Sequence, residues 1–373
     1  MSEVYAARRA RLRERCEAAG NAAALVTGHA NVRYLAGAAP GGAALLVGPA
    51  EDTLFCPVEP FGAAAAAPGP GCRTDEELRV HTLVSPDGDP AVAAAERATA
   101  AGARSLAVEE HHLTVARHRA LRSVAPRLRT ADLGTAVEQQ RLVKDSEEIA
   151  ALRIAAEIAD QALGELLESI LVGRTERHLA LELERRLVDH GAAGPAFPTQ
   201  VATGPNSGLA GHTPTDRRVE EGDFLSVALG AEYRGYRSEI ARTFVIGTAP
   251  ADWQIELYDQ VFAAQRAGRE ALAPGAACRA VDRAARSVLE AAGHGERVGP
   301  RTGHGVGLEN DEDPQLGPSA MGKLDACVPV TVDPGVHLPG RGGVRIDDTL
   351  VVRPEADGGP ELLTITTKEL LAL

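Results

Sequence analysis

Apolar runs of four to six residues recur along the first third of the chain, separated by residues typical of turns. These runs cover 23–27, 43–48, 53–56 and 105–108. Segments 91–101 and 114–124 instead repeat their apolar residues at helical spacing. Strands that alternate with helices predict a small α/β domain. The alanine run and the adjoining Pro-Gly pairs at 63–71 predict an exposed loop.

A long amphipathic helix opens the second part of the chain, close to residue 143. Asp145 can cap this helix, because Glu148 follows three residues later, which is the spacing of a capping box. Ile149 and Leu152 then begin an apolar face. We therefore expect an N-terminal α/β domain over 1–138 and a second domain over 139–373.

The second domain contains both helices and strands. Further helices are predicted at 176–189, 252–272 and 279–292. Strands are predicted at 224–230, 240–246, 328–332, 344–352 and 362–366. A helix pair and strands are thus followed by another helix pair and strands, an order that indicates an approximate internal duplication.

Composition argues against several classes of partner. The 373 residues suffice for two domains, and acidic residues outnumber basic ones 52 to 39, for a net charge of -13. This charge repels phosphates, and with aromatics at 3% there is little for bases to stack on, so we expect neither nucleic acid nor a membrane as a partner. No apolar stretch approaches the roughly 18 residues of a membrane span, and the Arg-rich segment 1–15 is not followed by the apolar region expected of a signal peptide. A cytoplasmic location is therefore expected.

The cysteines are odd in number and scattered, with no CxxC pair. They are Cys16, Cys56, Cys72, Cys278 and Cys327. This spacing predicts reduced thiols rather than a disulfide framework or a thiolate zinc site.

Four segments of the second domain resemble the M24 peptidases of the pita-bread fold, a family that contains Xaa-Pro aminopeptidases, prolidases, methionine aminopeptidases and creatinase. They are FPTQVATGPNSGLAGHTPTDRRVEEGDF at 197–224, SVALGAEYRGYRSEIARTFVIG at 226–247, GHGVGLENDEDP at 303–314 and VTVDPGVHLPGRGGVRIDDTLVV at 330–352. The helix from 143, VKDSEEIAALRIAAEIAD, and the N-terminal domain extend the resemblance over nearly the whole chain. It implies a creatinase-like α/β N-terminal domain followed by an α+β pita-bread domain. It also implies a homodimer in which the small domain of one subunit closes over the cleft of the other.

The resemblance places the family's metal ligands on an altered set of residues. In the family, two divalent ions are held by Asp, Asp, His, Glu and Glu. The corresponding positions here are Ala228, Glu239, His304, Asp333 and Asp347. Two further family histidines, which contact substrate and transition state, fall on Gly211 and Asp311. Only one of these seven positions keeps the family residue.

Charge and geometry together favour at most one metal ion. Three carboxylates leave a buried pair of divalent ions one charge short, whereas a single ion facing three carboxylates and an imidazole is satisfied. Each exchange of Glu and Asp moves a carboxylate by roughly 1.5 Å, far more than the tolerance of about 0.2 Å in ligand distances. We therefore expect Glu239, His304, Asp333 and Asp347 to hold no metal or a single manganese, cobalt, zinc or iron ion.

Other interpretations of these residues remain open. Asp333 and Asp347 can be solvated or paired with Arg345, and His304 can be a hydrogen-bonded core residue, although its flanking glycines favour a close backbone approach in a site. For His212, beside the lost family histidine, a surface role is favoured. Three neighbouring acidic residues are expected to lie in a solvated loop: Glu309, Glu312 and Asp313.

Three functional hypotheses follow. The favoured one is a peptidase-like hydrolase that cleaves a C–N or amide bond of a small peptide-like or amino-acid-derived substrate. Its candidate catalytic residues are Asp311, His212 and Arg345, the last expected to orient a carboxylate. The second hypothesis is an inactive, dimeric ligand-binding or scaffold protein. The third, a fully competent dinuclear aminopeptidase, ranks last because so many site positions differ.

Overall fold

The computed structural model describes residues 2–57, 78–83, 88–169 and 171–373. The chain forms two compact units, Met1–Arg141 and Leu142–Leu373. The loop expected at 63–71 and Cys72 lie outside the described residues. The four described cysteines are free thiols, and no helix in the described ranges is both long and apolar enough to cross a membrane.

The first unit is built on a six-stranded mixed sheet in the order β4-β3-β2-β1-β5-β6. Its strands are β1 (Ala23–Val26), β2 (Ala44–Val47), β3 (Asp52–Cys56), β4 (Arg79–Thr82), β5 (Ser105–Val108) and β6 (Arg129–Asp132). Strands β1 and β5, β5 and β6, and β3 and β4 pair in parallel, whereas β2 runs antiparallel to both β1 and β3. The helices are α1 (Ser2–Ala18), α2 (His29–Ala36), α3 (Pro90–Ala100), α4 (Val115–Val124) and α5 (Ala136–Arg141).

The predicted strands and helices of this unit are confirmed, but two strands and the helices α1, α2 and α5 were missed. The missed strands, β4 and β6, lie at the two edges of the sheet and carry mostly exposed side chains. A strand that buries neither face leaves no apolar pattern in the sequence.

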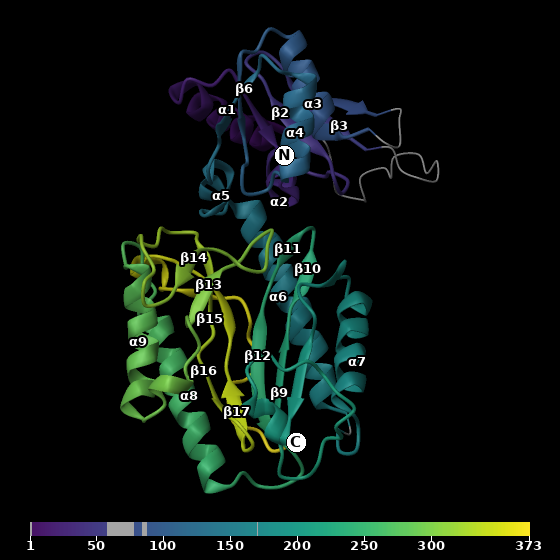
Figure 1. Cartoon of the computed structure of the whole chain (residues 1–373). Helices are drawn as coiled ribbons and strands as arrows, with labels where there is room; N and C mark the ends of the chain where they lie inside the picture. Colours follow the sequence, from purple (N-terminus) through teal and green to yellow (C-terminus); the bar gives the residue numbers. More distant parts are fainter. Residues whose placement is uncertain (1, 58–77, 84–87, 170) are drawn as a thin grey trace. The chain divides into compact units, whose positions relative to one another are not determined.

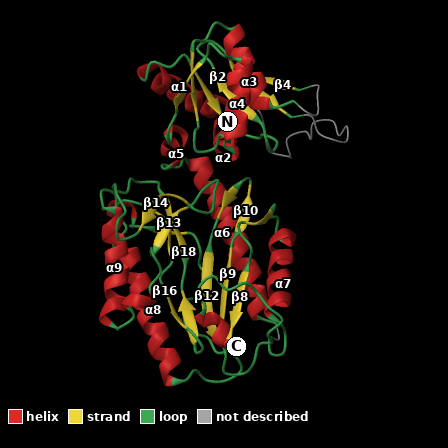
Figure 2. Ribbon diagram, viewed as in Figure 1, coloured by secondary structure: helices red, strands yellow, loops and turns green. Residues whose placement is uncertain are grey.

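The second unit places strands between two helix pairs. Helices α6 (Ser146–Leu167) and α7 (Glu176–Asp189) lie on one side, and α8 (Asp252–Glu270) and α9 (Cys278–Ala291) lie on the other (Figure 1). The strands between them are visible as the yellow layer of Figure 2. The predicted cap of α6 is present, since Asp145 and Glu148 each accept a hydrogen bond from the other's backbone N–H at 2.9 Å. Sharing of the strands by two helix pairs gives this unit its pita-bread architecture.

The strands beside α6 and α7 form two small sheets. One has the order β12-β9-β8 and the other β11-β10-β7. Their bounds are β7 (Gly194–Pro195), β8 (Gln200–Thr203), β9 (Phe224–Leu229), β10 (Ala231–Tyr233), β11 (Tyr236–Arg237) and β12 (Ile240–Val245). A 3-10 turn, η1 (Gly204–Gly208), follows β8.

The strands beside α8 and α9 form a five-stranded sheet, β14-β13-β15-β18-β19, and a hairpin of β16 and β17. Their bounds are β13 (Gly303–Gly305), β14 (Glu312–Leu316), β15 (Pro329–Val332), β16 (Gly335–Leu338), β17 (Gly342–Arg345), β18 (Asp348–Val351) and β19 (Glu361–Leu362). Short 3-10 turns lie at η2 (Gly295–Arg297) and η3 (Glu355–Asp357).

Two of the predicted strands need correction. The strand expected at 344–352 is interrupted at Ile346 and Asp347, where the chain passes from the hairpin to the five-stranded sheet. There Asp347 pairs through its backbone with Ala241 of β12 at 3.1 and 3.2 Å, which ties the two halves of the unit together. The strand expected at 362–366 ends at Leu362. Beyond it, the backbone N–H groups of Ile365 and Thr366 donate to the side chain of Asp160 and not to a neighbouring strand.

Candidate active site

A pocket of about 310 Å³ opens in the second unit, between the two groups of strands. Five of the sequence-predicted site residues line it: His212, Glu239, His304, Asp333 and Arg345. Glu239 precedes β12, His304 is the middle residue of β13, and Asp333 follows β15. These residues therefore meet at strands that are far apart in the sequence. Asp347, just before β18, joins them through Arg345.

The guanidinium of Arg345 lies among the three acidic side chains. Its Nη2 is 2.6 Å from Oε1 of Glu239, 2.9 Å from Oδ2 of Asp347 and 3.4 Å from Oδ2 of Asp333. The side chains of Glu239 and Asp347 are 4% and 0% exposed. A partly exposed cation thus balances some of the charge of three largely buried carboxylates, the pairing that the sequence left open for Asp333 and Asp347.

The acidic groups respond differently to this environment. Burial raises the pKa of Asp347 well above its usual range, and the charge of Glu239 adds to the rise while Arg345 opposes it. Burial likewise raises the pKa of Asp333. For Glu239 burial acts in the same direction, but the charges of Arg345 and His304 outweigh it and the pKa is lowered. Groups with pKa values pushed apart in one pocket are typical of acid–base chemistry.

His304 is held in one orientation by its neighbours. Its backbone N–H donates to Oγ1 of Thr331 at 3.0 Å, and Nδ1 lies 3.0 Å from the carbonyl oxygen of Gly305. Nδ1 therefore carries a proton, and Nε2 points toward Oε2 of Glu239 at 3.5 Å. Burial lowers the pKa of His304, but Glu239 overcomes this effect and raises it.

The two glycines that flank His304 are required by close packing, as predicted. A Cβ on Gly303 would lie 2.3 Å from the carbonyl oxygen of Thr331, and one on Gly305 would lie 2.3 Å from that of Asp313. The backbone of β13 can therefore approach its neighbours only without side chains at these two positions.

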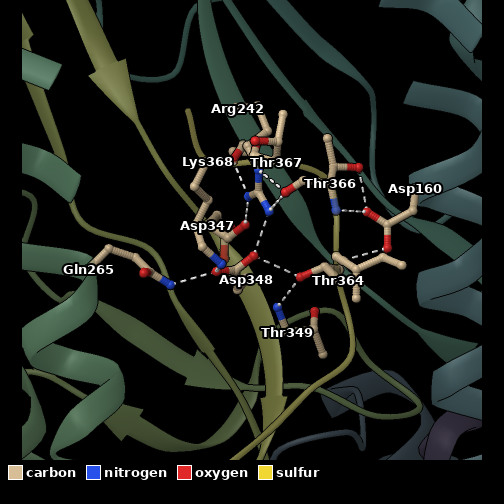
Figure 3. A network of polar contacts seen from close by, with 12 residues as sticks. Asp160, Arg242, Gln265, Asp347, Asp348, Thr349, Thr364, Thr366, Thr367 and Lys368 are labelled. Atoms are coloured by element: carbon tan, nitrogen blue, oxygen red, sulfur yellow. Dashed lines mark hydrogen bonds and ion pairs between the residues drawn. The ribbon is translucent and has the colours of Figure 1, made fainter. Parts of the chain in front are cut away.

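A network of polar contacts fixes the backbone of Asp347 (Figure 3). Fully buried Arg242 donates from Nη1 to the carbonyl oxygen of Asp347 at 2.7 Å and from Nη2 to Oδ1 of Asp348 at 2.7 Å. Asp348 also accepts hydrogen bonds from Lys368 at 2.6 Å and Gln265 at 2.7 Å. Burial raises the pKa of Asp348, but the two cations outweigh burial and lower it. Sequence reasoning did not identify Arg242 or Asp348.

The buried carboxylate of Glu176 holds residues at the wall of the pocket through hydrogen bonds. Glu176, the first residue of α7, is fully buried and accepts hydrogen bonds from Nε2 of His212 at 2.8 Å and from the backbone N–H groups of Thr203 and Thr215 at 2.8 and 2.9 Å. His212 lines the pocket and its side chain is only 10% exposed, so the surface role favoured from the sequence is wrong. No sequence pattern marked Glu176.

Asp311 does not line the pocket with the other candidate residues. It is exposed and is bound by Arg301, which does line the pocket, and by Gln315 at 3.0 Å. The solvated loop expected around it is wrong for Glu312, which is 8% exposed and lies 2.5 Å from Nζ of Lys144. Asn310 lines the pocket and donates to Oε2 of Glu239 at 3.2 Å, a contact that the sequence did not suggest.

Position 228 faces the pocket side of its sheet. Ala228 on β9 pairs with Gln200 of β8, which lines the pocket, and directly opposed residues of antiparallel strands share a face. The neighbours Val227 and Leu229 point the other way, into the core under α6 and α7. The position where the family has its first aspartate thus carries only a methyl group.

The pocket residues offer carboxylate oxygens and one imidazole nitrogen as possible metal ligands. Within the described parts of the chain, ligand atoms of three His, Cys, Asp or Glu residues come within 4.8 Å of one another only at His111, His112 and Glu138, which belong to the first unit. Ala228 offers no ligand atom, and Arg345 lies among the carboxylates of Glu239, Asp333 and Asp347. The residues suit one hard divalent ion chemically, since Oδ1 of Asp333 and Oδ1 of Asp347 are buried and accept no hydrogen bond from the described residues.

Comparison with known proteins agrees with this architecture. Residues 150–354 match metallopeptidase family M24, and residues 8–143 match the creatinase/prolidase N-terminal domain. An uncharacterized peptidase of Bacillus subtilis is 32% identical over 353 residues, covering 94% of this chain and 95% of that protein. A Xaa-Pro dipeptidase of Pyrococcus furiosus is 37% identical over 235 residues, covering 63% of this chain and 66% of that protein.

Solved structures support the fold over almost the whole chain. A Xaa-Pro dipeptidase from Bacillus anthracis superposes with a TM-score of 0.89 at 30% identity, covering 99% of this chain and 100% of that one. The prolidase from Pyrococcus horikoshii gives a TM-score of 0.86 at 30% identity, with coverages of 97% and 99%. The expected creatinase-like N-terminal domain and pita-bread domain are confirmed, and the chain belongs to metallopeptidase family M24.

Proposed function

We propose that this chain is an M24-type hydrolase that cleaves the amide bond of a small peptide-like or amino-acid-derived substrate, with at most one metal ion in its pocket. The observation that carries the proposal is the convergence of Glu239, His304, Asp333 and Asp347 around one small pocket in this fold. The Xaa-Pro dipeptidases among the similar proteins support a short substrate. A pocket of about 310 Å³ also suits a ligand of dipeptide size.

The pocket residues supply the groups that amide hydrolysis requires. Water must lose a proton as its oxygen attacks the carbonyl carbon, and the leaving nitrogen must gain one as the C–N bond breaks. Asp333, with Oδ1 free of hydrogen bonds from described residues, and His304, with Nε2 directed toward Glu239, are the groups that can carry this proton. Arg345 orients the carboxylates and provides positive charge for the developing oxyanion.

A single divalent ion, if bound, would be held by Glu239, His304, Asp333 and Asp347 and would supply Lewis acidity and an activated water. Manganese, cobalt, zinc and iron all accept this mixture of carboxylate oxygens and imidazole nitrogen. Glu239 and Asp333 in the pocket lining offer carboxylate oxygens to the ammonium group of a peptide.

The remaining candidate catalytic residues act at the edge of the pocket. Glu176 fixes the tautomer of His212, because its carboxylate accepts a hydrogen bond from Nε2–H of that ring. Nδ1 of His212 is then free of a proton and can accept a hydrogen bond from a ligand. Asp311 acts only through Arg301, which it positions at the pocket wall. We therefore assign Asp311 a positioning role.

Steady-state assays on a panel of Xaa-Pro and non-prolyl dipeptides test this function. We expect slow hydrolysis of at least one member and a loss of about 10²- to 10⁴-fold in kcat for Asp333→Asn. The matched control is Asp325→Asn, an exposed aspartate outside the pocket lining. Hydrolysis of Xaa-Pro dipeptides at ordinary peptidase rates would contradict the altered-site account, and the absence of any turnover would reject the hydrolase.

The alternative function is that of an inactive binding or scaffold protein. One observation favours it: the guanidinium of Arg345 lies among the three carboxylates that would otherwise surround a metal ion. In that case a dipeptide would raise the Tm of the protein without being consumed, as thermal shift and product analysis of the same sample would reveal.

We also propose a homodimer and a cytoplasmic location, both on the strength of the family resemblance and composition. Light scattering at micromolar concentration should give twice the chain mass of 38.9 kDa. A monomer at this concentration would reject the dimer.

A further inference from the structure

A second cluster of metal-ligating side chains lies in the first unit, outside the pocket. Its members are His111 and His112, in the turn after β5, and Glu138, on α5. Nε2 of His111 is 2.8 Å from Oε1 of Glu138, and Nε2 of His112 is 3.6 Å from the same oxygen. One ligand atom from each of the three residues lies within 4.8 Å of those of the others.

The two imidazoles face the same side although they are consecutive. Their ring centroids are 4.4 Å apart with an interplanar angle of 47°, which the turn between β5 and α4 permits. The ring of His112 packs on the backbone of Gly28, where a Cβ would lie 2.7 Å from its Cδ2 atom. Replacement of Gly28 by any other residue would therefore displace this imidazole.

Glu138 is held in place by a chain of buried polar groups. Nδ2 of Asn31 lies 2.7 Å from Oε1 of Glu138 and 2.7 Å from Oε1 of Glu109. Glu109, 1% exposed, in turn accepts the backbone N–H of Gly28 at 2.7 Å, and Arg141 fixes Asn31 through a 2.7 Å hydrogen bond to Oδ1. Such outer partners orient a ligating carboxylate and hold it ready for a metal ion.

One oxygen of Glu138 has no hydrogen-bond partner among the described residues. Its Oε2 is buried and accepts no hydrogen bond from the described residues, although the side chain as a whole is 21% exposed. A buried carboxylate oxygen is normally satisfied, so an orphaned one beside two imidazoles points to a ligand that donates or binds there.

We propose that His111, His112 and Glu138 bind one divalent transition-metal ion, independently of the M24 pocket. Two imidazoles and a carboxylate match zinc, cobalt or nickel, whereas magnesium and calcium prefer oxygen ligands alone. The histidine side chains are 39% and 36% exposed, so the ion can enter from solvent and keep water in its remaining positions. A bound metal ion would link the turn after β5, which carries His111 and His112, to Glu138 on α5.

Zinc titration of the full-length chain by calorimetry at pH 7.5 tests this site. Every variant carries His304→Ala, so that the pocket has lost its imidazole ligand. We expect one zinc ion per chain in this background and at least a tenfold rise in Kd for each of His111→Ala, His112→Ala and Glu138→Gln. His118→Ala and Glu110→Gln, neighbours outside the cluster, should bind as the parent does.

A spectroscopic readout separates ligation from general effects on folding. Cobalt bound by the parent should show d–d absorption, which His111→Asn and Glu138→Gln should reduce or shift while the Tm without metal stays unchanged. The proposal is overturned if the parent binds no zinc at 100-fold molar excess, or if the variant lacking all three side chains binds as tightly as the parent. A surface hydrogen bond between histidine and glutamate is then all that the cluster provides.

Discussion

Nη2 of Arg345 lies 2.6 Å from Oε1 of Glu239, in a pocket where the related family gathers carboxylates around metal ions. The same nitrogen reaches Asp347 and Asp333, so a side chain of the protein supplies positive charge to three acidic groups. This relationship connects the stability of the fold to the chemistry of the pocket, because every carboxylate that Arg345 binds is also a candidate metal ligand.

Removing Arg345 should therefore destabilise the metal-free protein. Arg345→Ala leaves three buried carboxylates without their cation, and we expect a loss of about 3 kcal/mol or more in the free energy of unfolding. Urea denaturation in EDTA measures this loss. Arg341→Ala is the matched control, since it removes an exposed arginine stacked on Trp253 at 4.2 Å and should cost only about 0.5–1 kcal/mol. Equal losses in the two variants would contradict the role given to Arg345.

The pair of Arg242 and Asp348 should contribute strongly to stability above acidic pH. Asp348→Asn leaves a fully buried guanidinium with a neutral partner, and we expect a cost of about 3–5 kcal/mol at pH 7. The pKa of Asp348 is lowered in the folded state, so this contribution is present above the pKa of the unfolded carboxyl and is lost as the pH falls through the folded value. The difference between wild type and variant in urea denaturation should shrink from pH 6 to pH 3. A difference that grows on acidification would reject this assignment.

Glu176 should maintain the wall of the pocket. Glu176→Ala leaves the backbone N–H groups of Thr203 and Thr215 without their acceptor, which we expect to cost about 3 kcal/mol in total. Hydrogen exchange should show faster exchange of both amides in the variant. Glu184→Ala is the control on the same helix, since Glu184 accepts only a weaker 3.2 Å hydrogen bond from Thr199. Unchanged protection of Thr203 and Thr215 would show that Glu176 does not hold this segment.

Restoring the family residues should restore a second metal ion. The fourfold variant Ala228→Asp, Glu239→Asp, Asp333→Glu and Asp347→Glu supplies the missing charge and corrects three carboxylate lengths together. Ala228→Asp alone should achieve less, because the other three carboxylates stay misplaced. The number of manganese ions per chain is measured by elemental analysis of each variant after incubation with manganese. His304→Ala should abolish metal binding in the pocket in each background.

Activity of the fourfold variant should remain weak. Gly211 and Asp311 leave no imidazole at the positions of the two family histidines, and the loss of one such donor typically costs about 10²- to 10³-fold in rate. Adding Gly211→His and Asp311→His should then raise kcat on a Xaa-Pro dipeptide. A fourfold variant already as active as the sixfold one would show that these two positions do not matter.

The sequence predicted those features that depend on local patterns. Asp145 and Glu148 are three residues apart, so their capping box was visible, and the glycines beside His304 indicated the close approach of β13. Arg242 and Asp348 are separated by 106 residues, and their pairing depends on how β12 and β18 meet in the fold. His212 was misjudged for the same reason, since Glu176 reaches it only through tertiary structure.

The metal content of the pocket tests the central claim most directly. The measurement is elemental analysis of protein purified without chelator and carrying His111→Ala and His112→Ala, so that metal at the proposed second site is not counted. We predict no more than one ion per chain, because Ala228 supplies no ligand and Arg345 already lies among the three carboxylates. A ratio near two ions per chain would contradict it and restore the dinuclear peptidase.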